Sequence, residues 1–176
     1  QVSSQMTAYN MLNTKYYIVQ ESAQGVVQNP TACGNAWFVS TIKQVASHDE
    51  EMASIAAFDP NETAIVHEEF SDDVYNYSFG KSSDASIELS AFKPNHLQYR
   101  SNNSQDGLAV FSEVYYSNGW NAYIDGEPTE IIRVNYILRA IKVPAGSHSI
   151  EMKFEPSSYA IGERVSLAGS ALFVLF

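Results

Sequence analysis

The second half of the chain alternates apolar and polar side chains with a two-residue period. Ile87, Leu89 and Ala91 alternate with Glu88 and Ser90. The same alternation marks residues 97–100, 132–136 and 150–155. This period is that of a strand with one buried and one exposed face. Residues 108–116 are apolar on both faces, which predicts a central strand that is buried from both sides.

Turn signals separate these segments at intervals of about ten residues. Asp125-Gly126 follows the predicted strand Trp120–Ile124 and indicates a hairpin turn of type I′. Pro144-Ala145-Gly146 ends a further predicted strand, Leu138–Val143. Strands at this spacing are typical of two-sheet domains. We therefore predict a mainly β fold, an antiparallel β-sandwich or jelly-roll-like domain with one or two short helices.

The first half of the chain contains shorter predicted elements. Strands are predicted at Lys15–Gln20, at Thr63–His67 and, as a single long strand, at Trp37–Val45. Residues 4–12 could form a short helix, and residues 25–34 have the composition of a loop.

A second helix is predicted by a capping box. Ser47 and Glu50 have the spacing in which each side chain satisfies a free amide at the start of a helix. The helix should run from about His48 to Ala57, with its apolar face formed by Met52, Ile55 and Ala56.

The last twelve residues, Val165 to Phe176, are uncharged and rich in small side chains. Two interpretations are open: a buried final strand or helix, and the first part of a membrane-spanning helix, which needs about 20 apolar residues. Because the chain starts at Gln1 without an initiator methionine, we expect it to be part of a longer protein. We favour the second interpretation, with one domain over residues 1–162 and the start of a transmembrane helix over residues 163–176.

The composition supports a folded core and argues against nucleic-acid binding. Apolar residues make up 45% of the 176 residues and charged residues only 17%. The net charge of −10 is concentrated in residues 49–84, which contain ten acidic residues and only one Lys or Arg, Lys81. An acidic surface repels phosphate backbones, so we expect no nucleic-acid partner and interpret this segment as a solvated acidic face.

No catalytic or metal-binding motif is found in the sequence. The four histidines are not spaced as ligands on one helix, and the carboxylates do not follow the pattern of a calcium loop. No nucleophile elbow, phosphate-binding loop or dinucleotide fingerprint occurs, so no catalytic residue, metal or cofactor is expected. Cys33 cannot form an internal disulfide and is interpreted as a small buried or loop residue. We interpret Asp125 as a residue of the Asp125-Gly126 turn rather than as an acid–base catalyst.

Four aromatic residues are candidate contacts for a glycan. Aromatic side chains beside polar groups are a common means of sugar recognition in β-sandwich modules, and Trp37, Tyr116, Trp120 and Tyr123 have such neighbours. Core packing is the alternative interpretation for a tryptophan at the start of a strand.

Several segments together resemble the YfhO-type family of polytopic bacterial membrane proteins. They occur in the family's order at Leu12–Tyr16, Gly34–Val39, the predicted helix, Phe58–Val66, Gly119–Gly126, Val143–His148 and Gly162. The most specific pair is Trp-x-Ala-x-Ile-Asp-Gly at Trp120–Gly126, followed by Val-Pro-Ala-Gly-x-His at Val143–His148. The matching residues themselves look structural, as a tight turn, a loop and core aromatics.

The resemblance implies an extracytoplasmic domain of a bacterial cytoplasmic-membrane protein, located just before a final membrane helix. Such proteins resemble membrane glycosyltransferases that use lipid-linked sugars. Their catalytic acid is expected in an early loop between the first membrane helices, so none is carried over to this chain. We expect a non-catalytic domain that positions a cell-envelope glycan acceptor, with the transmembrane part of the same chain and this glycan as its partners.

Two other functions stay open at this point. The chain could be a carbohydrate-binding module that is independent of any transferase, as the aromatic-rich sandwich suggests. It could also be a purely structural or assembly domain that packs on the membrane part. A contiguous exposed apolar patch would favour this last function.

Overall fold

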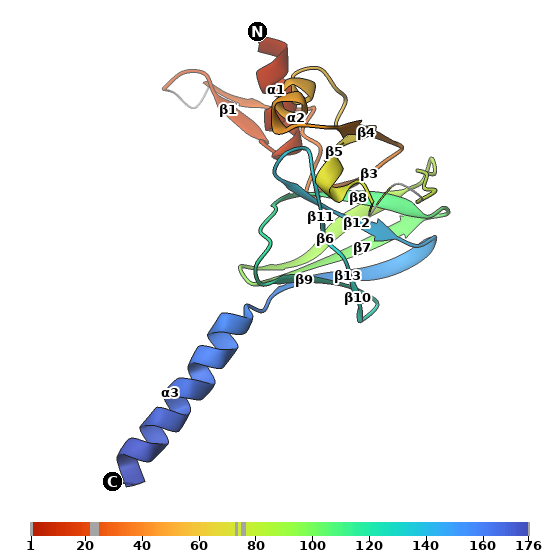
Figure 1. The fold of residues 1–176 in the computed structure, drawn as a ribbon. Helices are drawn as coiled ribbons and strands as arrows, with labels where there is room; N and C mark the ends of the chain where they lie inside the picture. The colour runs from red at the N-terminus through yellow and green to blue at the C-terminus, as the bar shows by residue number, and fades with distance from the viewer. Residues whose placement is uncertain (1, 22–24, 73, 75–76, 176) are drawn as a thin grey trace.

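Two antiparallel sheets form the body of the protein (Figure 1). The computed structural model describes residues 2–21, 25–72, 74 and 77–175. The five-stranded sheet has the order β10-β9-β13-β7-β6 and the four-stranded sheet the order β11-β12-β8-β3. The first comprises β6 (Ser86–Lys93), β7 (His96–Asn103), β9 (Trp120–Ile124), β10 (Glu127–Thr129) and β13 (Gly146–Phe154). The second comprises β3 (Ala36–Val39), β8 (Gly107–Val114), β11 (Ile132–Val134) and β12 (Leu138–Val143).

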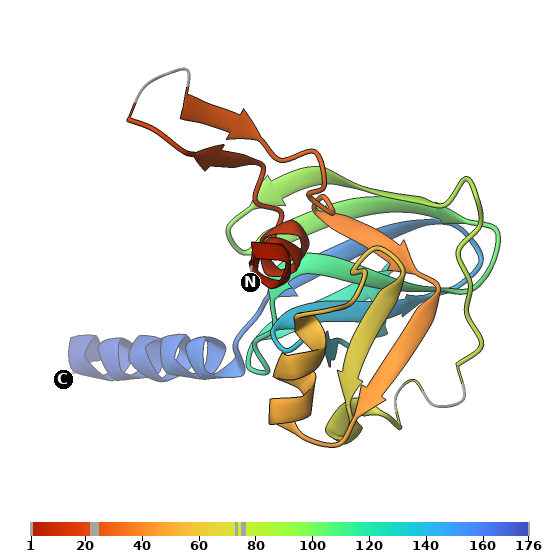
Figure 2. The same cartoon turned by 90° about the horizontal axis from the view of Figure 1, so that it is seen from above.

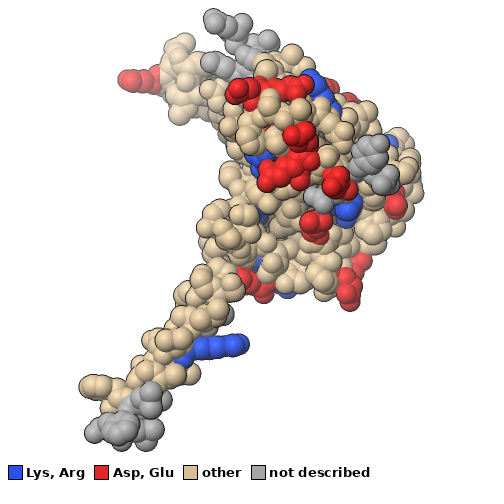
Figure 3. Space-filling view, viewed as in Figure 1, with Lys and Arg blue, Asp and Glu red and all other residues tan. Residues whose placement is uncertain are grey.

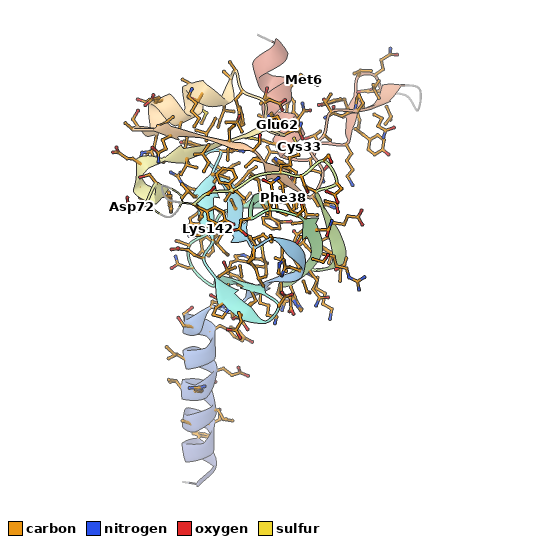
Figure 4. All side chains as sticks on the ribbon, turned by 90° about the vertical axis from the view of Figure 1, so that its right-hand side faces the viewer. Met6, Cys33, Phe38, Glu62, Asp72 and Lys142 are labelled. Carbon is orange, nitrogen blue, oxygen red and sulfur yellow. The ribbon has the colours of Figure 1, made fainter. Side chains whose placement is uncertain are left out.

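The two sheets pack face to face around one apolar core. Phe38 and Phe111 from the four-stranded sheet meet Tyr99 and Ile150 from the five-stranded sheet. The rings of Tyr99 and Phe111 make an edge contact with their centroids 4.9 Å apart. Figure 4 shows Phe38 inside the body of the domain. The predicted mainly β fold and antiparallel sandwich are therefore confirmed.

A third layer covers the outer face of the four-stranded sheet. It contains α1 (Val2–Met11), β4 (Thr41–Val45), α2 (His48–Ile55), β5 (Thr63–His67) and the short 3₁₀ helix η2 (Glu68–Phe70). Its apolar side chains form a second core with Leu108 and Val110 of β8. Because Ala109 and Phe111 of the same strand belong to the first core, β8 is buried on both faces from Gly107 to Phe111, as predicted. The end of the predicted segment is not buried: Val114 is 57% and Tyr116 is 55% exposed.

The single long strand predicted at Trp37–Val45 is wrong, because the chain divides it into β3 and β4. The amides of Ser40 and Thr41 both donate to the carbonyl oxygen of Glu62, each at 2.9 Å. This pairing bends the chain out of the four-stranded sheet. From Thr41 onward it forms a parallel pair with β5, which was not predicted.

Helix α2 begins as predicted but buries a different face. Ser47 caps it and accepts a hydrogen bond from the amide of Glu50 at 3.2 Å, while the Glu50 carboxylate accepts one from Ala46. Ile55 is buried as expected, but Met52 is 49% exposed. The buried residues of the helix include Glu51, a charged side chain with no accessible surface.

A two-stranded hairpin extends from the body near α1 (Figure 2). It consists of β1 (Tyr16–Ile18) and β2 (Val26–Gln28), so the loop predicted over residues 25–34 contains a short strand. Ile18 is 78% exposed, and the hairpin also exposes Tyr16, Val26 and Val27. The hairpin thus presents apolar side chains that the domain itself does not cover.

The C-terminal residues form α3 (Ser157–Leu175), which extends away from the sheets (Figure 1). The described side chains of this helix are exposed, with Leu167 at 72% and Phe173 at 87%. The interpretation of the C-terminal residues as a buried final strand or helix is therefore wrong. Within the described residues, no helix is long and apolar enough to cross a membrane, so the predicted start of a transmembrane helix is not confirmed. Phe176, the last residue of that prediction, lies outside the described residues.

Candidate functional site

A groove lies beside the β9–β10 hairpin and the root of α3. Its first part is a polar basin with a volume of about 400 Å³. The basin is lined by Tyr115, Tyr116, Ser117, Trp120, Asn121, Ala122, Tyr123, Pro128, Thr129, Glu130 and Ile131. A second cavity of about 510 Å³ adjoins it, shares Tyr116 and Ser117, and reaches Ser157 at the start of α3. We call the two cavities together the groove.

One wall of the groove is held by a carboxylate that lies just outside it. The hydroxyl of Tyr123 and the side-chain amide of Asn121 both donate to Oε2 of Glu155, each at 3.0 Å. The bonds from Asn121 and Tyr123 hold the pKa of Glu155 below its usual value. The same bond to Glu155 raises the pKa of Tyr123. These three side chains therefore form a fixed polar edge.

Trp120 is supported from inside the sandwich by an arginine. The guanidinium carbon of Arg139 lies 4.2 Å from the centre of the Trp120 ring, and Arg139 is only 4% exposed. Its Nε–H donates to the carbonyl oxygen of Val114 at 2.8 Å. Burial lowers the pKa of Arg139 and raises that of the neighbouring Glu113. A buried cation stacked on an indole face fixes the ring orientation at the edge of the groove.

The structure brings together three of the four aromatic residues predicted to contact a glycan. Tyr116, Trp120 and Tyr123 all line the groove, and Tyr116 lines both of its cavities. Trp37 does not line it: this side chain is 7% exposed in the second core, and its Nε1–H donates to the carbonyl oxygen of Pro60. Core packing, the alternative interpretation, is correct for Trp37.

Sequence reasoning missed several residues of the groove. Tyr115 lies within residues 108–116, the segment predicted to be buried on both faces, so the sequence did not single it out as a site residue. Glu130 lies in a short connection between two strands that belong to different sheets. No sequence motif predicts that these residues meet Trp120, because the contact depends on how the β9–β10 hairpin folds over the end of β8.

A buried carboxylate holds the strained turn between β11 and β12 of the four-stranded sheet. Asn135 and Tyr136 have positive φ angles of 49° and 72°. The amide of Tyr136 donates to Oε1 of Glu51 at 2.8 Å, and Arg133 lies 3.4 Å from the other oxygen. Asn135 is paired with the backbone of Ile65 through both its amide and its side-chain oxygen. This arrangement fastens α2 and β5 to the sheet and is structural.

The acidic segment forms an exposed face, as its composition indicated. Figure 3 shows acidic side chains gathered over α2 and the segment that follows it. Except for Glu51, the described acidic residues of positions 49–84 are exposed; Asp73 lies outside the described residues. Among the residues that the structure describes, no group of three or more His, Cys, Asp or Glu side chains is arranged to hold a metal ion.

Cys33 is partly buried beside the second core. Burial, with a contribution from Asp59, raises the pKa of its thiol to about 11. At neutral pH the residue is therefore a protonated thiol rather than a nucleophilic thiolate.

Comparison with known proteins identifies a family to which the chain is similar. The model of a family described as "Bacterial membrane protein YfhO" matches residues 57–166. This span contains all the residues that line the groove, and it contains the segments Gly119–Gly126 and Val143–His148. The segments Leu12–Tyr16 and Gly34–Val39 lie outside it. No curated protein matches the chain, and no solved structure matches it.

Proposed function

The chain belongs to the YfhO family of bacterial membrane proteins, and from this premise we propose that it is a non-catalytic extracytoplasmic domain that positions a cell-envelope glycan acceptor. The parent protein would be a membrane glycosyltransferase that takes its sugar from a lipid carrier. The observation that carries the proposal is the groove, in which Tyr116, Trp120 and Tyr123 surround a polar basin.

The lining of the groove suits a sugar. Aromatic rings can pack against the apolar C–H face of a pyranose, and nearby hydroxyl, amide and carboxylate groups can bond to its hydroxyls. Ser117, Asn121 and Thr129 supply such groups from three different segments. A basin of about 400 Å³ is within the range of small-ligand sites and is open enough for an internal unit of a longer polymer.

The position of the groove supports a role at the membrane. Its second cavity includes Ser157 and Ser158 of the first turn of α3. Along α3, exposed apolar side chains include Ile161, Val165 and Leu167. We propose that this helix leads into the membrane, which would place the groove at the bilayer surface, where an acceptor polymer could be presented to the membrane part of the protein.

Binding of envelope oligosaccharides tests the proposal. The purified 176-residue chain, kept in a mild detergent to cover α3, should bind fragments of an envelope glycan in calorimetric titrations. Tyr116→Ala should weaken binding at least tenfold, because this ring lines both cavities. Phe92→Ala is the matched control, since Phe92 is 64% exposed and lies outside the groove. No binding by a folded wild-type chain would contradict the proposal.

Location is a separate test. The full-length gene product should fractionate with bacterial membranes, and a protease added outside the cytoplasm should cleave this domain. Recovery of the full-length protein in the soluble fraction would contradict the membrane role, whatever the result of the glycan titration.

The hairpin of β1 and β2 favours a second candidate function, assembly on the membrane part of the same protein. Tyr16, Ile18 and Val26 are all about half exposed or more, although isolated two-stranded hairpins are only marginally stable in water. Ile18→Ser should then reduce the amount of assembled full-length protein without changing glycan binding by the 176-residue chain. Normal assembly of this variant would exclude the hairpin as a docking element.

A further inference from the structure

The groove is lined by aromatic side chains and one carboxylate, and the described residues of its lining include no basic side chain. None of the described residues that line its two cavities is Lys or Arg, whereas Glu130 lines the polar basin of about 400 Å³. Glu155 stands at the edge of this basin, bonded to Asn121 and Tyr123. Neither carboxylate forms an ion pair within the described part of the chain.

The basic residues nearest to the groove are already engaged by the protein. Arg139 is covered by Trp120 and bonded to the carbonyl oxygen of Val114. The ammonium of Lys153 lies 5.0 Å from the Tyr123 ring but is paired with Glu151 at 2.8 Å. The charge that a ligand meets in the open basin is therefore that of the carboxylates.

From this charge and these rings we propose that the groove selects a glycan unit that carries an ammonium group. This inference rests on the proposed function and specifies the ligand class of the same site. Glu130 would face the ammonium group. Tyr115 and Tyr116 would present ring faces to its adjacent C–H groups, an arrangement in which aromatic quadrupoles attract cations. An anionic sugar would be repelled by Glu130, and a neutral one could donate a hydroxyl hydrogen bond to it but would gain no attraction between opposite charges.

A pair of oligosaccharides with the same backbone isolates the charge. The probes are a chitosan tetrasaccharide and its fully N-acetylated counterpart, titrated calorimetrically into the 176-residue chain at pH 6. An exposed carboxylate and a pair of ring faces together predict that the chitosan tetrasaccharide binds about three- to tenfold more tightly than its N-acetylated counterpart. Glu130→Gln should reduce this preference to about twofold or less.

The matched control is Glu127→Gln, which removes a charge from the same hairpin at an exposed position outside the groove lining. This variant should retain the preference. Equal binding of the two probes by the wild-type chain overturns the inference and leaves the proposed function in place. Equal losses in Glu127→Gln and Glu130→Gln also overturn it, because they would show attraction to the overall net charge of −10. No binding of either probe contradicts the glycan groove as well.

Discussion

The Oδ2 atom of Asp125 lies 2.6 Å from Nδ1 of His148, which ties the β9–β10 turn to the start of β13. Asp125 Oδ1 also accepts a hydrogen bond from the amide of Ser149 at 2.9 Å. On its other side, the His148 ring lies 3.3 Å from the carbonyl oxygen of Ala145. Asp125 and His148 come from the two most specific segments of the family resemblance. The contact joins the two segments in space: one supplies the turn and the other holds it.

The Asp125–His148 pair predicts a pH-dependent contribution to stability. The bond to Asp125 raises the pKa of His148 above 6.5, and the bond to His148 lowers the pKa of Asp125 below 3.8. The histidine contribution is complete below its unfolded pKa and is lost as pH rises through the folded value. The aspartate contribution is present above its unfolded pKa and is lost as pH falls through the folded value. The pair should therefore stabilise the fold most between about pH 4 and 6.5.

Titration of His148 by NMR checks this prediction directly. The ring should titrate above the usual histidine value in the wild-type chain and return toward that value in Asp125→Asn, which keeps a side chain suited to the turn. Urea unfolding from pH 6 to 9 should show a larger loss of stability in the wild type than in this variant. Identical titration of His148 in the two chains would contradict the assigned contact.

Replacing Glu51 should destabilise the whole domain. Glu51→Ala would remove the acceptor of the Tyr136 amide and leave Arg133 without its carboxylate partner. Because breaking a buried charged contact leaves the other partner uncompensated, we expect a loss of about 3–5 kcal/mol in the free energy of unfolding. Glu51→Gln should lose less, since its amide oxygen can still accept from Tyr136. Urea denaturation measures both.

Met52→Ala is the control for Glu51. The apolar pattern of the helix predicted Met52 on the buried face, but its side chain is 49% exposed. We therefore expect a change of less than about 1 kcal/mol, as is usual for exposed sites. A loss as large as that of Glu51→Ala would mean that the sequence-based face of α2 was correct after all.

The two tryptophans should differ in both stability and spectrum. Trp37→Phe removes the donor to the carbonyl oxygen of Pro60 in the core, which should cost about 1–3 kcal/mol. The chain has two tryptophans, so Trp120→Phe leaves Trp37 as the sole indole. The fluorescence maximum of the Trp120→Phe variant should lie at shorter wavelength than that of the Trp37→Phe variant, in which the partly exposed Trp120 remains. Emission at the same wavelength in both variants would contradict the different burial.

The strands of the sandwich could be predicted because their burial is periodic. The alternation at Ile150–Glu155 belongs to β13, and the double-sided apolar segment after Gly107 belongs to β8 between two cores. The break at Ser40 could not be predicted from local pattern. It depends on a carbonyl of Glu62, more than twenty residues away, which accepts two amides and redirects the chain.

The site could be predicted only in part, for a similar reason. Tyr116, Trp120 and Tyr123 lie within eight residues of one another, so their proximity in the groove follows from one hairpin and the segment before it. Trp37 also has a polar residue nearby in the sequence, Asn35, but it lies on the face of β3 that is covered by the third layer. The spacing of residues in the sequence cannot predict that this layer covers Trp37, because the residues of the layer come from α1, α2 and β5.

Arg139 should be needed for the shape of the groove, although it does not line the groove itself. Arg139→Lys keeps the positive charge but loses the planar group that stacks on Trp120 and the Nε–H that donates to Val114. We expect a loss of about 1–3 kcal/mol in the free energy of unfolding and, in the folded variant, weaker glycan binding through a less fixed Trp120 ring. Arg100→Lys, at an exposed position of β7, is the matched control and should leave both quantities unchanged. Weakened binding with unchanged stability would point to direct contact between Arg139 and the ligand, whereas unchanged values of both would contradict the supporting role.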